Sequence, residues 1–275
     1  MCDTFNGILN SGYFPEEWTE GVIIPVHKKG DKSDVKNYRG ITLISCMFKI
    51  LTAVLTKRIA AFCDLNNSIS DAQFGFSKGK STVDALVELW YLNKKNDYIV
   101  KMAYDCIHRN AMWLKLYKLC IDGNILRIVK DMYEKVKYCV RSCNNYSQFF
   151  EYAVGLRQGE VISPILFSLF VEDLEVFFQN DVISGHSFDD FLLILLLFAD
   201  DMVILGKSVD EINTSLELLC NYCNTWSLEV NAHKTKVMFF RKRCGLLSSE
   251  VFTYNGNRLE VVNDFNYLAT VLNYR

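Results

Sequence analysis

Apolar positions along the chain follow two different periods. Spacings of three and four residues predict helices over 41–62, 83–95, 110–136, 163–178 and 210–226. The third of these divides near Asp122-Gly123. Short β-rich runs predict strands at 22–28, 98–105, 191–198 and 202–206, a hairpin over 142–159, and three strand-like pieces between 227 and 272. The mixed order of helices and strands predicts an α+β fold in which a sheet is backed by helices.

Polar residues support several of these boundaries. Ser81-Thr82 leads into the helix at 83, and Ser163 followed by Pro164 is typical of a helix start, so a long buried helix is expected there. Ser208 and Glu211 have the spacing of a capping box. Asn255-Gly256 predicts a tight hairpin turn.

Composition indicates one large folded unit with subdomains. Half of the 275 residues are hydrophobic, which excludes a disordered chain, and there are only three prolines. Ten cysteines lack the repeated pairs of a zinc site, so free thiols are favoured over a disulfide or metal framework. The first residues do not resemble a signal peptide, and the apolar run 191–199 is too short to span a membrane.

Charge is informative only locally, because the net charge is −2. Residues 27–39 carry five basic side chains against two acids, and residues 234–243 carry five against none. Such clusters suit a ligand rich in phosphate, although a solvated face has the same composition.

The segment LLLFADDMVILG places two adjacent aspartates, Asp200 and Asp201, between apolar strands. Burial of an isolated carboxylate is costly, so the pair must lie at an exposed turn or face a cation. At a hairpin tip, two carboxylates offer hard oxygen ligands to Mg²⁺. A lone pair of this kind is more often a polar turn, so the neighbouring motifs decide the interpretation.

Seven motifs stand in series along the chain: HKKGDKSDVKNYRGITLIS, DAQFGFSKGKSTVDAL, KMAYDCIHRNAMWLKL, GLRQGEVISPILFSLFVEDL, LLFADDMVILG, WSLEVNAHKTKVM and FNYLATVL. Their identity, order and spacing closely resemble the reverse transcriptase domain of non-LTR (LINE-type) retrotransposons. The resemblance extends from about residue 10 to residue 275.

The resemblance implies the fingers and palm of a right-handed polymerase, with the thumb missing. Residues 1–97 and 106–150 would form fingers and palm helices, and residues 98–105 and 151–275 mostly palm, ending at a hairpin that resembles the primer grip. The implied reaction is DNA synthesis on an RNA template, in which a primer 3′-hydroxyl attacks the α-phosphate of a dNTP beside two Mg²⁺ ions. The implied partners are an RNA template, a DNA primer and dNTP, with no membrane.

The family pattern implies roles for nine residues of this chain. Asp200 and Asp201 match the paired metal-binding and catalytic aspartates, with Asp200 the expected ligand of both ions. The others match substrate-binding positions: Gln158 and Gly159 at the nucleotide and template pocket, Tyr104 under the sugar, Arg39, Lys28 and Lys29 near the triphosphate, and Lys234 near the pyrophosphate. Each basic residue taken alone is as readily a solvated surface side chain.

The sequence departs from the family at one carboxylate. The family pattern F-x-D-F-x-K-A-[FY]-D places its first aspartate six residues before its last, and here the last is Asp105, a structural partner in the family. Six residues earlier stands Ile99. Asp97 is displaced by two residues, about 6.5 Å along a strand, so it is a poor substitute. Ser77 also replaces a customary arginine.

These departures predict a degenerate or truncated copy with impaired catalysis, because small errors in positioning reactants greatly reduce the rate. No endonuclease segment is expected before residue 1. Two alternatives remain open: a non-catalytic module that binds RNA and DNA, and a translated relic with no function.

Overall fold

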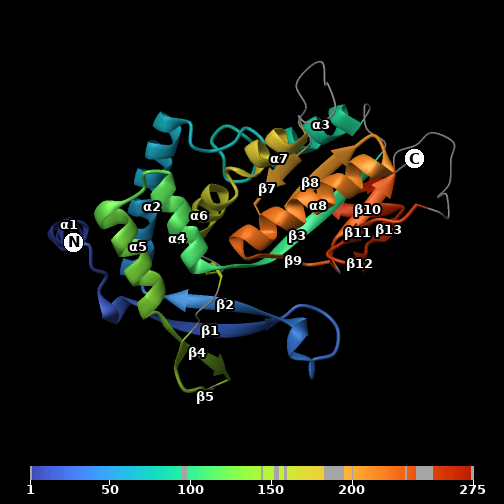
Figure 1. Cartoon of the computed structure of the whole chain (residues 1–275). Coiled ribbons are helices and arrows are strands. Elements are labelled where there is room, and N and C mark those ends of the chain that lie inside the picture. Colours follow the sequence, from blue (N-terminus) through green and yellow to red (C-terminus); the bar gives the residue numbers. More distant parts are fainter. Residues whose placement is uncertain are drawn as a thin grey trace. The chain divides into compact units, whose positions relative to one another are not determined.

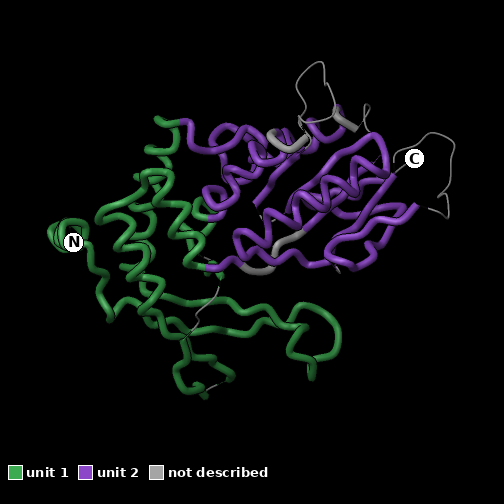
Figure 2. Tube along the Cα trace, in the orientation of Figure 1, with its two compact units in different colours: residues 1–66, 109–166 green, residues 67–108, 167–275 purple. Residues whose placement is uncertain are grey.

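The structure is a computed structural model of the chain, and it describes residues 2–93, 98–143, 145–151, 155–157, 160–182, 195–199, 201–232, 234–239 and 250–273. The chain forms two compact units, each built from two separate stretches of the sequence (Figure 2). Unit 1 contains residues 1–66 and 109–166, and unit 2 contains residues 67–108 and 167–275. Helices and strands alternate in both units, so the structure is α+β, as the apolar periods predict (Figure 1).

Unit 1 combines helices with one sheet. Its helices are α1 (Cys2–Ser11), α2 (Cys46–Asn66), α4 (Arg109–Lys118) and α5 (Gly123–Lys135), with 3-10 turns η1 (Glu16–Trp18) and η2 (Val35–Asn37). Its strands are β1 (Glu20–His27), β2 (Tyr38–Ile44), β4 (Lys137–Ser142), β5 (Asn145–Tyr146) and β6 (Phe150–Glu151). The sheet order is β2-β1-β4-β5, with β6 also paired to β4. The β1–β2 hairpin is antiparallel, whereas β1 and β4 are parallel.

Unit 2 is built on a six-stranded sheet in the order β13-β10-β3-β8-β7, with β9 also paired to β3. These strands are β3 (Tyr98–Ile107), β7 (Leu195–Phe198), β8 (Asp201–Gly206), β9 (Leu228–Val230), β10 (Lys236–Phe239) and β13 (Glu260–Val262). Two small hairpins lie outside this sheet: β11 (Thr253–Tyr254) with β12 (Asn257–Arg258), and β14 (Asp264–Tyr267) with β15 (Thr270–Asn273). The helices are α3 (Thr82–Asn93), α7 (Leu174–Val182) and α8 (Val209–Trp226), and α6 (Ser163–Phe170) spans the sequence boundary between the two units.

The core of unit 2 lies against this sheet. Helix α8 packs on β8 and runs along the sheet (Figure 1). A second cluster joins side chains of the sheet to α3 and to β14: Phe74, Ala85, Leu89, Ile99, Leu196, Val203, Leu205, Met238, Phe265 and Tyr267. Because successive strand residues face opposite sides, both faces of β8 are buried by this arrangement.

Residues 41–44 are a strand, so the prediction of helix from residue 41 is wrong at its start. They belong to β2, where Ile41 pairs with Ile24 and Ile44 pairs with Gly21, and α2 begins only at Cys46. A short apolar run has no period that separates strand from helix, and pairing with β1 decides its conformation.

The predicted long helix 163–178 is two helices, α6 and α7. The Tyr222 hydroxyl, from α8, donates to the Asp173 carboxylate at 2.5 Å and lies 3.3 Å from the Phe170 carbonyl. The Leu174 amide bonds back to Val171 with three-residue spacing, and the Phe177 amide then bonds to Asp173, where α7 begins. A tyrosine remote in the sequence thus fixes the break.

The predicted hairpin over 142–159 is also shifted. Its first strand is β4, which ends at Ser142, and Ser142 pairs with Asn145, so Asn145 belongs to strand β5 and not to the turn, while Asn144 lies outside the described residues. Regular pairing after the turn is limited, within the described residues, to β5 and β6, both only two residues long.

Candidate active site

The hairpin of β7 and β8 holds the two adjacent aspartates. Phe198 pairs with Asp201, which closes the hairpin, and Ala199, directly after β7, has a left-handed φ of 54°. Leu195–Leu197 and Met202–Leu205 are buried, which gives the turn a rigid base. The Asp201 side chain is about a quarter exposed, at 27%. Asp200 itself lies outside the described residues.

The glycine-rich loop before α3 supports this turn. The Phe74 amide donates to the Leu197 carbonyl at 2.7 Å, and the Leu197 amide donates to the Ala72 carbonyl at 2.9 Å. The Gly75 amide donates to the Gln73 side chain at 3.0 Å. A β-carbon at Gly75 would lie 2.3 Å from the Ala199 nitrogen, so only glycine allows this approach.

Gly75→Ala is expected to displace the aspartate turn and to lower the free energy of unfolding by about 1–3 kcal/mol, the usual cost of overpacking. Urea unfolding of both forms measures it. Gly7→Ala is the control, because nothing lies within 4 Å of a β-carbon there and alanine favours helix α1. Equal effects of the two substitutions would contradict the close approach.

Strand β3 lies beside β8 in antiparallel register. Ala103 pairs with Asp201, Lys101 with Val203, and Ile99 with Leu205. Directly paired residues point to the same face, and every second residue shares that face. The side of the sheet that carries Asp201 therefore also carries Lys101 and Ile99.

Ile99 is fully buried, in the cluster between the sheet, α3 and β14. Its partner Leu205 is four residues from Asp201, which corresponds to about 13 Å along the strand. A carboxylate at position 99 would be surrounded by Val203, Leu205 and Met238. Asp97 lies outside the described residues.

Lys101 contacts Asp201, and reasoning from the sequence missed this contact. Its ammonium lies 3.3 Å from the Asp201 Oδ1 atom and donates to the Asn266 carbonyl at 2.8 Å. It also lies 5.9 Å from the centre of the Tyr267 ring. The family pattern places lysine at the position of Met102, so KMAYD shows a displaced lysine but not which residue it contacts. A lysine one residue earlier points to the opposite face of a strand.

The charge of Asp201 affects the pKa of Tyr267. Burial raises the pKa of the Tyr267 hydroxyl above its usual value, and the neighbouring Asp201 carboxylate raises it further. Asp201 thus lies at the edge of a poorly hydrated region, with Lys101 as its cationic neighbour.

Two further residues that the family pattern assigns to the substrate site, Lys234 and Tyr104, belong to unit 2. Lys234 is exposed in the connection from β9 to β10, and its amide donates to the Asn231 side chain at 3.0 Å. Tyr104 pairs with Val230, and the register shifts between Tyr104 and Cys106, so Asp105 stands at an irregularity of β3. The side chains of Tyr104 and Asp105 lie outside the described part of the structure.

The remaining residues that the family pattern assigns to the substrate site belong to unit 1. Lys28 and Lys29 are exposed in the loop after β1, and Arg39 is exposed on β2 opposite Val26. The Lys28 amide donates to the Asn37 carbonyl at 2.8 Å, which closes the loop. Gln158 and Gly159 lie outside the described residues.

A buried ion pair that sequence reasoning missed flanks Gln158 and Gly159. Arg157 donates to the Glu160 carboxylate at 2.8 Å, and the two side chains are 2% and 3% exposed. Arg157 also donates to the Met132 carbonyl and lies over the Tyr133 ring at 4.6 Å. Burial raises the pKa of the Glu160 carboxyl, and the Arg157 charge opposes this shift. Arg157 and Glu160 are thus each held in the core of unit 1.

The described side chains around Asp201 do not fit a two-metal centre. No group of three or more His, Cys, Asp or Glu residues that could hold a metal ion occurs within the described residues. Asp201 offers one carboxylate, and its described cationic neighbour is the Lys101 ammonium. Two Mg²⁺ ions need several oxygen ligands in near-octahedral geometry.

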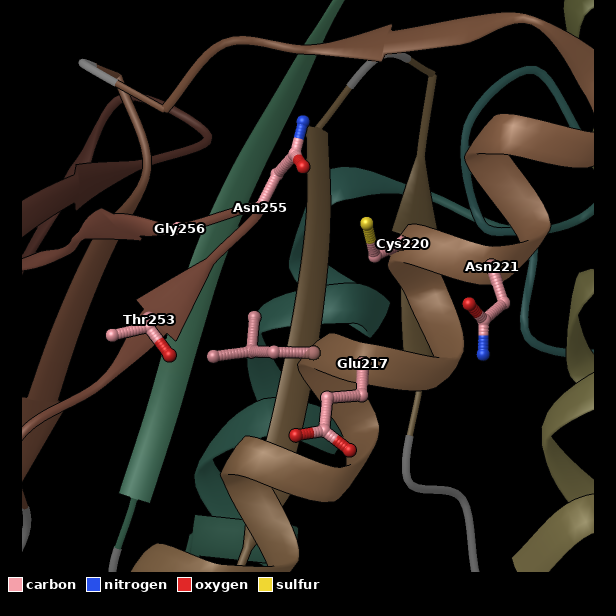
Figure 3. A pocket seen from close by; sticks show the side chains of 7 residues that line it. Glu217, Cys220, Asn221, Thr253, Asn255 and Gly256 are labelled. Atoms are coloured by element: carbon pink, nitrogen blue, oxygen red, sulfur yellow. The ribbon is translucent and has the colours of Figure 1, made fainter.

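A pocket of about 370 Å³ lies elsewhere in unit 2, between α8 and the β11–β12 hairpin (Figure 3). Its lining includes Glu217, Cys220, Thr253 and Asn255, and none of the predicted site residues. Among the described helices, none is long and apolar enough to cross a membrane.

Comparison with known families gives one extensive match. A family profile described as "Reverse transcriptase (RNA-dependent DNA polymerase)" matches residues 26–271. The chain is 29% identical over 181 residues to the "Probable RNA-directed DNA polymerase from transposon BS" of Drosophila melanogaster, and 25% identical over 178 residues to the "Retrovirus-related Pol polyprotein from type-1 retrotransposable element R2" of Popillia japonica. These matches cover 62% and 60% of the chain, but only 20% and 24% of the relatives.

Solved structures with a similar fold include two telomerases. One is from Candida tropicalis, in complex with a TWJ fragment of telomeric RNA, with a TM-score of 0.60, 13% identity, and coverage of 99% of this chain and 46% of that chain. The other, from Candida albicans, has a TM-score of 0.57, 12% identity, and coverage of 94% and 48%. At this identity the likeness concerns the fold alone, which is polymerase-like.

Proposed function

Because this chain belongs to the reverse transcriptase family, as a domain of the non-LTR (LINE-type) retrotransposon kind, we propose that it binds an RNA template paired with a DNA primer but catalyses DNA synthesis weakly or not at all. The observation that carries the proposal is the surroundings of Asp201. Its cationic partner is Lys101, while the position expected to supply another carboxylate, Ile99, belongs to the apolar core.

Binding of nucleic acid is supported by the basic β1–β2 hairpin. Lys28, Lys29 and Arg39 are exposed there, on a backbone held by seven residue pairs. Exposed lysine and arginine side chains on a rigid hairpin suit the phosphates of a duplex or of a dNTP. The fingers and palm assignment and the roles of Gln158, Gly159, Tyr104 and Lys234 belong to this same proposal.

Impaired catalysis follows from charge and position. Two-metal phosphoryl transfer needs carboxylates that converge on the ions, and the described surroundings of Asp201 supply an ammonium instead. Mg²⁺ held by Asp200 and Asp201 alone would position the primer hydroxyl poorly, and errors near 1 Å cost about a hundredfold. The same observation favours the second candidate function, a non-catalytic RNA- and DNA-binding remnant.

Fluorescence anisotropy with a labelled RNA–DNA duplex tests binding. The logarithm of the association constant is expected to fall steeply with the logarithm of salt, because phosphate contacts release counterions. Replacing Lys28, Lys29 and Arg39 by glutamine is expected to reduce that slope by about 2–3, since each basic side chain that neutralises a phosphate accounts for roughly 0.7–0.9 of it.

A matched control removes the same charge from α2 by replacing Lys49, Lys57 and Arg58, which are exposed in the same unit. This variant is expected to keep most of the slope. Binding that is insensitive to salt, or an equal reduction in both triple variants, would contradict the proposed interface. Aggregation in place of cooperative unfolding would instead indicate a relic without function.

A further inference from the structure

Four charged side chains lie on neighbouring strands of the sheet of unit 2. Three of them are in register, and the fourth, Asp201, is two residues along β8 from Val203, the register partner of Lys101. Glu260 on β13 pairs in register with Lys236 on β10, and Lys236 pairs in register with Lys101 on β3. Ion pairs connect Lys236 to Glu260 and Lys101 to Asp201. From β13 through β10 and β3 to β8, the charges are therefore in the order acid, base, base, acid, with one carboxylate for each lysine.

The two central lysines make this pairing directional. Like charges directly opposite each other in an antiparallel pair repel. The Lys101 and Lys236 ammonium groups are therefore more stable when they point away from each other. Lys236 lies toward Glu260, and Lys101 lies toward Asp201. The Lys101 and Asp201 side chains are 19% and 27% exposed, so water screens their attraction only partly.

Three contacts hold the Lys101 ammonium. It lies 3.3 Å from the Asp201 carboxylate, donates to the Asn266 carbonyl at 2.8 Å, and lies 5.9 Å from the Tyr267 ring, within the range of a cation–π contact. Two of these contacts come from β14, which also packs Phe265 and Tyr267 into the core. The ammonium thus joins the aspartate hairpin to the β14–β15 hairpin.

We propose that the Lys101 ammonium is a built-in counter-ion that takes the place of a divalent cation at Asp201 and excludes such an ion there. A fixed positive charge 3.3 Å from Oδ1 repels a divalent ion and occupies the side of the carboxylate that faces β3. The inference concerns only the cation at Asp201, and it holds whether or not the chain binds nucleic acid.

Mn²⁺ binding to the full chain, followed by the electron paramagnetic resonance signal of the free ion, tests the proposal. Lys101→Met is expected to bind Mn²⁺ about tenfold or more tightly than the wild type, because the repelling charge is removed. Lys101→Arg is expected to match the wild type. Lys101→Met combined with Asp201→Asn is expected to bind Mn²⁺ no more tightly than the wild type.

Lys32→Met controls for the removal of one positive charge, because Lys32 is exposed in unit 1. It is expected to bind Mn²⁺ as the wild type does. Equal Mn²⁺ affinity of the wild type and Lys101→Met would overturn the proposal. Should Lys101→Met not fold, the wild type alone decides: its thermal midpoint is expected to be the same in millimolar Mg²⁺ as in EDTA, and a higher midpoint in Mg²⁺ would overturn the proposal.

Discussion

Replacing Arg157 by leucine is expected to lower the free energy of unfolding by about 3–5 kcal/mol, because Glu160 would be left as a buried charge without its partner. The two side chains are 2% and 3% exposed, so little water can compensate. Leucine would also remove the bond to the Met132 carbonyl and the contact with the Tyr133 ring. Urea unfolding followed by circular dichroism measures the change.

Arg58→Leu is the matched control, since Arg58 is exposed on α2 in the same unit. Its effect is expected to be small, as for most surface substitutions. Arg157→Leu combined with Glu160→Leu is expected to regain part of the stability, because no unpaired charge remains. A decrease for Arg157→Leu no larger than that for Arg58→Leu would show that the ion pair contributes little.

The destabilisation should depend on pH. Burial raises the pKa of the Glu160 carboxyl above its ordinary value of 4.5, so the folded chain holds this proton more tightly than the unfolded chain does. The stability that this protonation contributes is fully present below the ordinary pKa. It is lost as the pH rises through the pKa that Glu160 has in the folded chain. In Arg157→Leu the pKa of Glu160 in the folded chain rises further, because the Arg157 charge no longer lowers it. The loss of free energy of unfolding is therefore expected to be smaller in acid than at neutral pH.

Local patterns predicted the elements whose geometry is determined by neighbouring residues. One half of the predicted capping box is present, since the Glu211 amide donates to the Ser208 hydroxyl at 3.1 Å, while the Glu211 carboxylate accepts from the Lys207 amide at 2.7 Å. Asn255 and Gly256 form the expected turn, with φ values of 46° and 73°. The hairpin of β7 and β8 was also predicted correctly, because two apolar strands separated by a short polar segment leave few other arrangements.

Contacts between remote residues could not be read from the sequence. The break between α6 and α7 depends on Tyr222, almost fifty residues along the chain, and the strand at 41–44 depends on its pairing with β1. The partner of Asp201 depends on the register between β3 and β8. One residue of register decides whether Lys101 or Met102 faces the aspartate, and no period in KMAYD determines that register.

The predicted catalytic role of Asp200 and Asp201 stays a prediction, and it depends most on the residue at position 99. The family pattern expects a further carboxylate at position 99, and the structure places a fully buried isoleucine there. Introducing an aspartate at this position is expected to cost stability rather than to restore a site, because the carboxylate would be surrounded by apolar side chains. Loss of polymerase chemistry with retention of duplex binding is therefore the central expectation.

Primer extension tests this expectation most directly. Purified chain, an RNA template with an annealed DNA primer, Mg²⁺ and dNTPs are incubated beside a variant that carries Asp200→Asn and Asp201→Asn, at a protein concentration that saturates the duplex. Misplaced reactants cost about a hundredfold or more, so extension by the wild type is expected to be indistinguishable from that of the variant. Clear extension that depends on dNTPs and Mg²⁺, and that the variant lacks, would contradict the account.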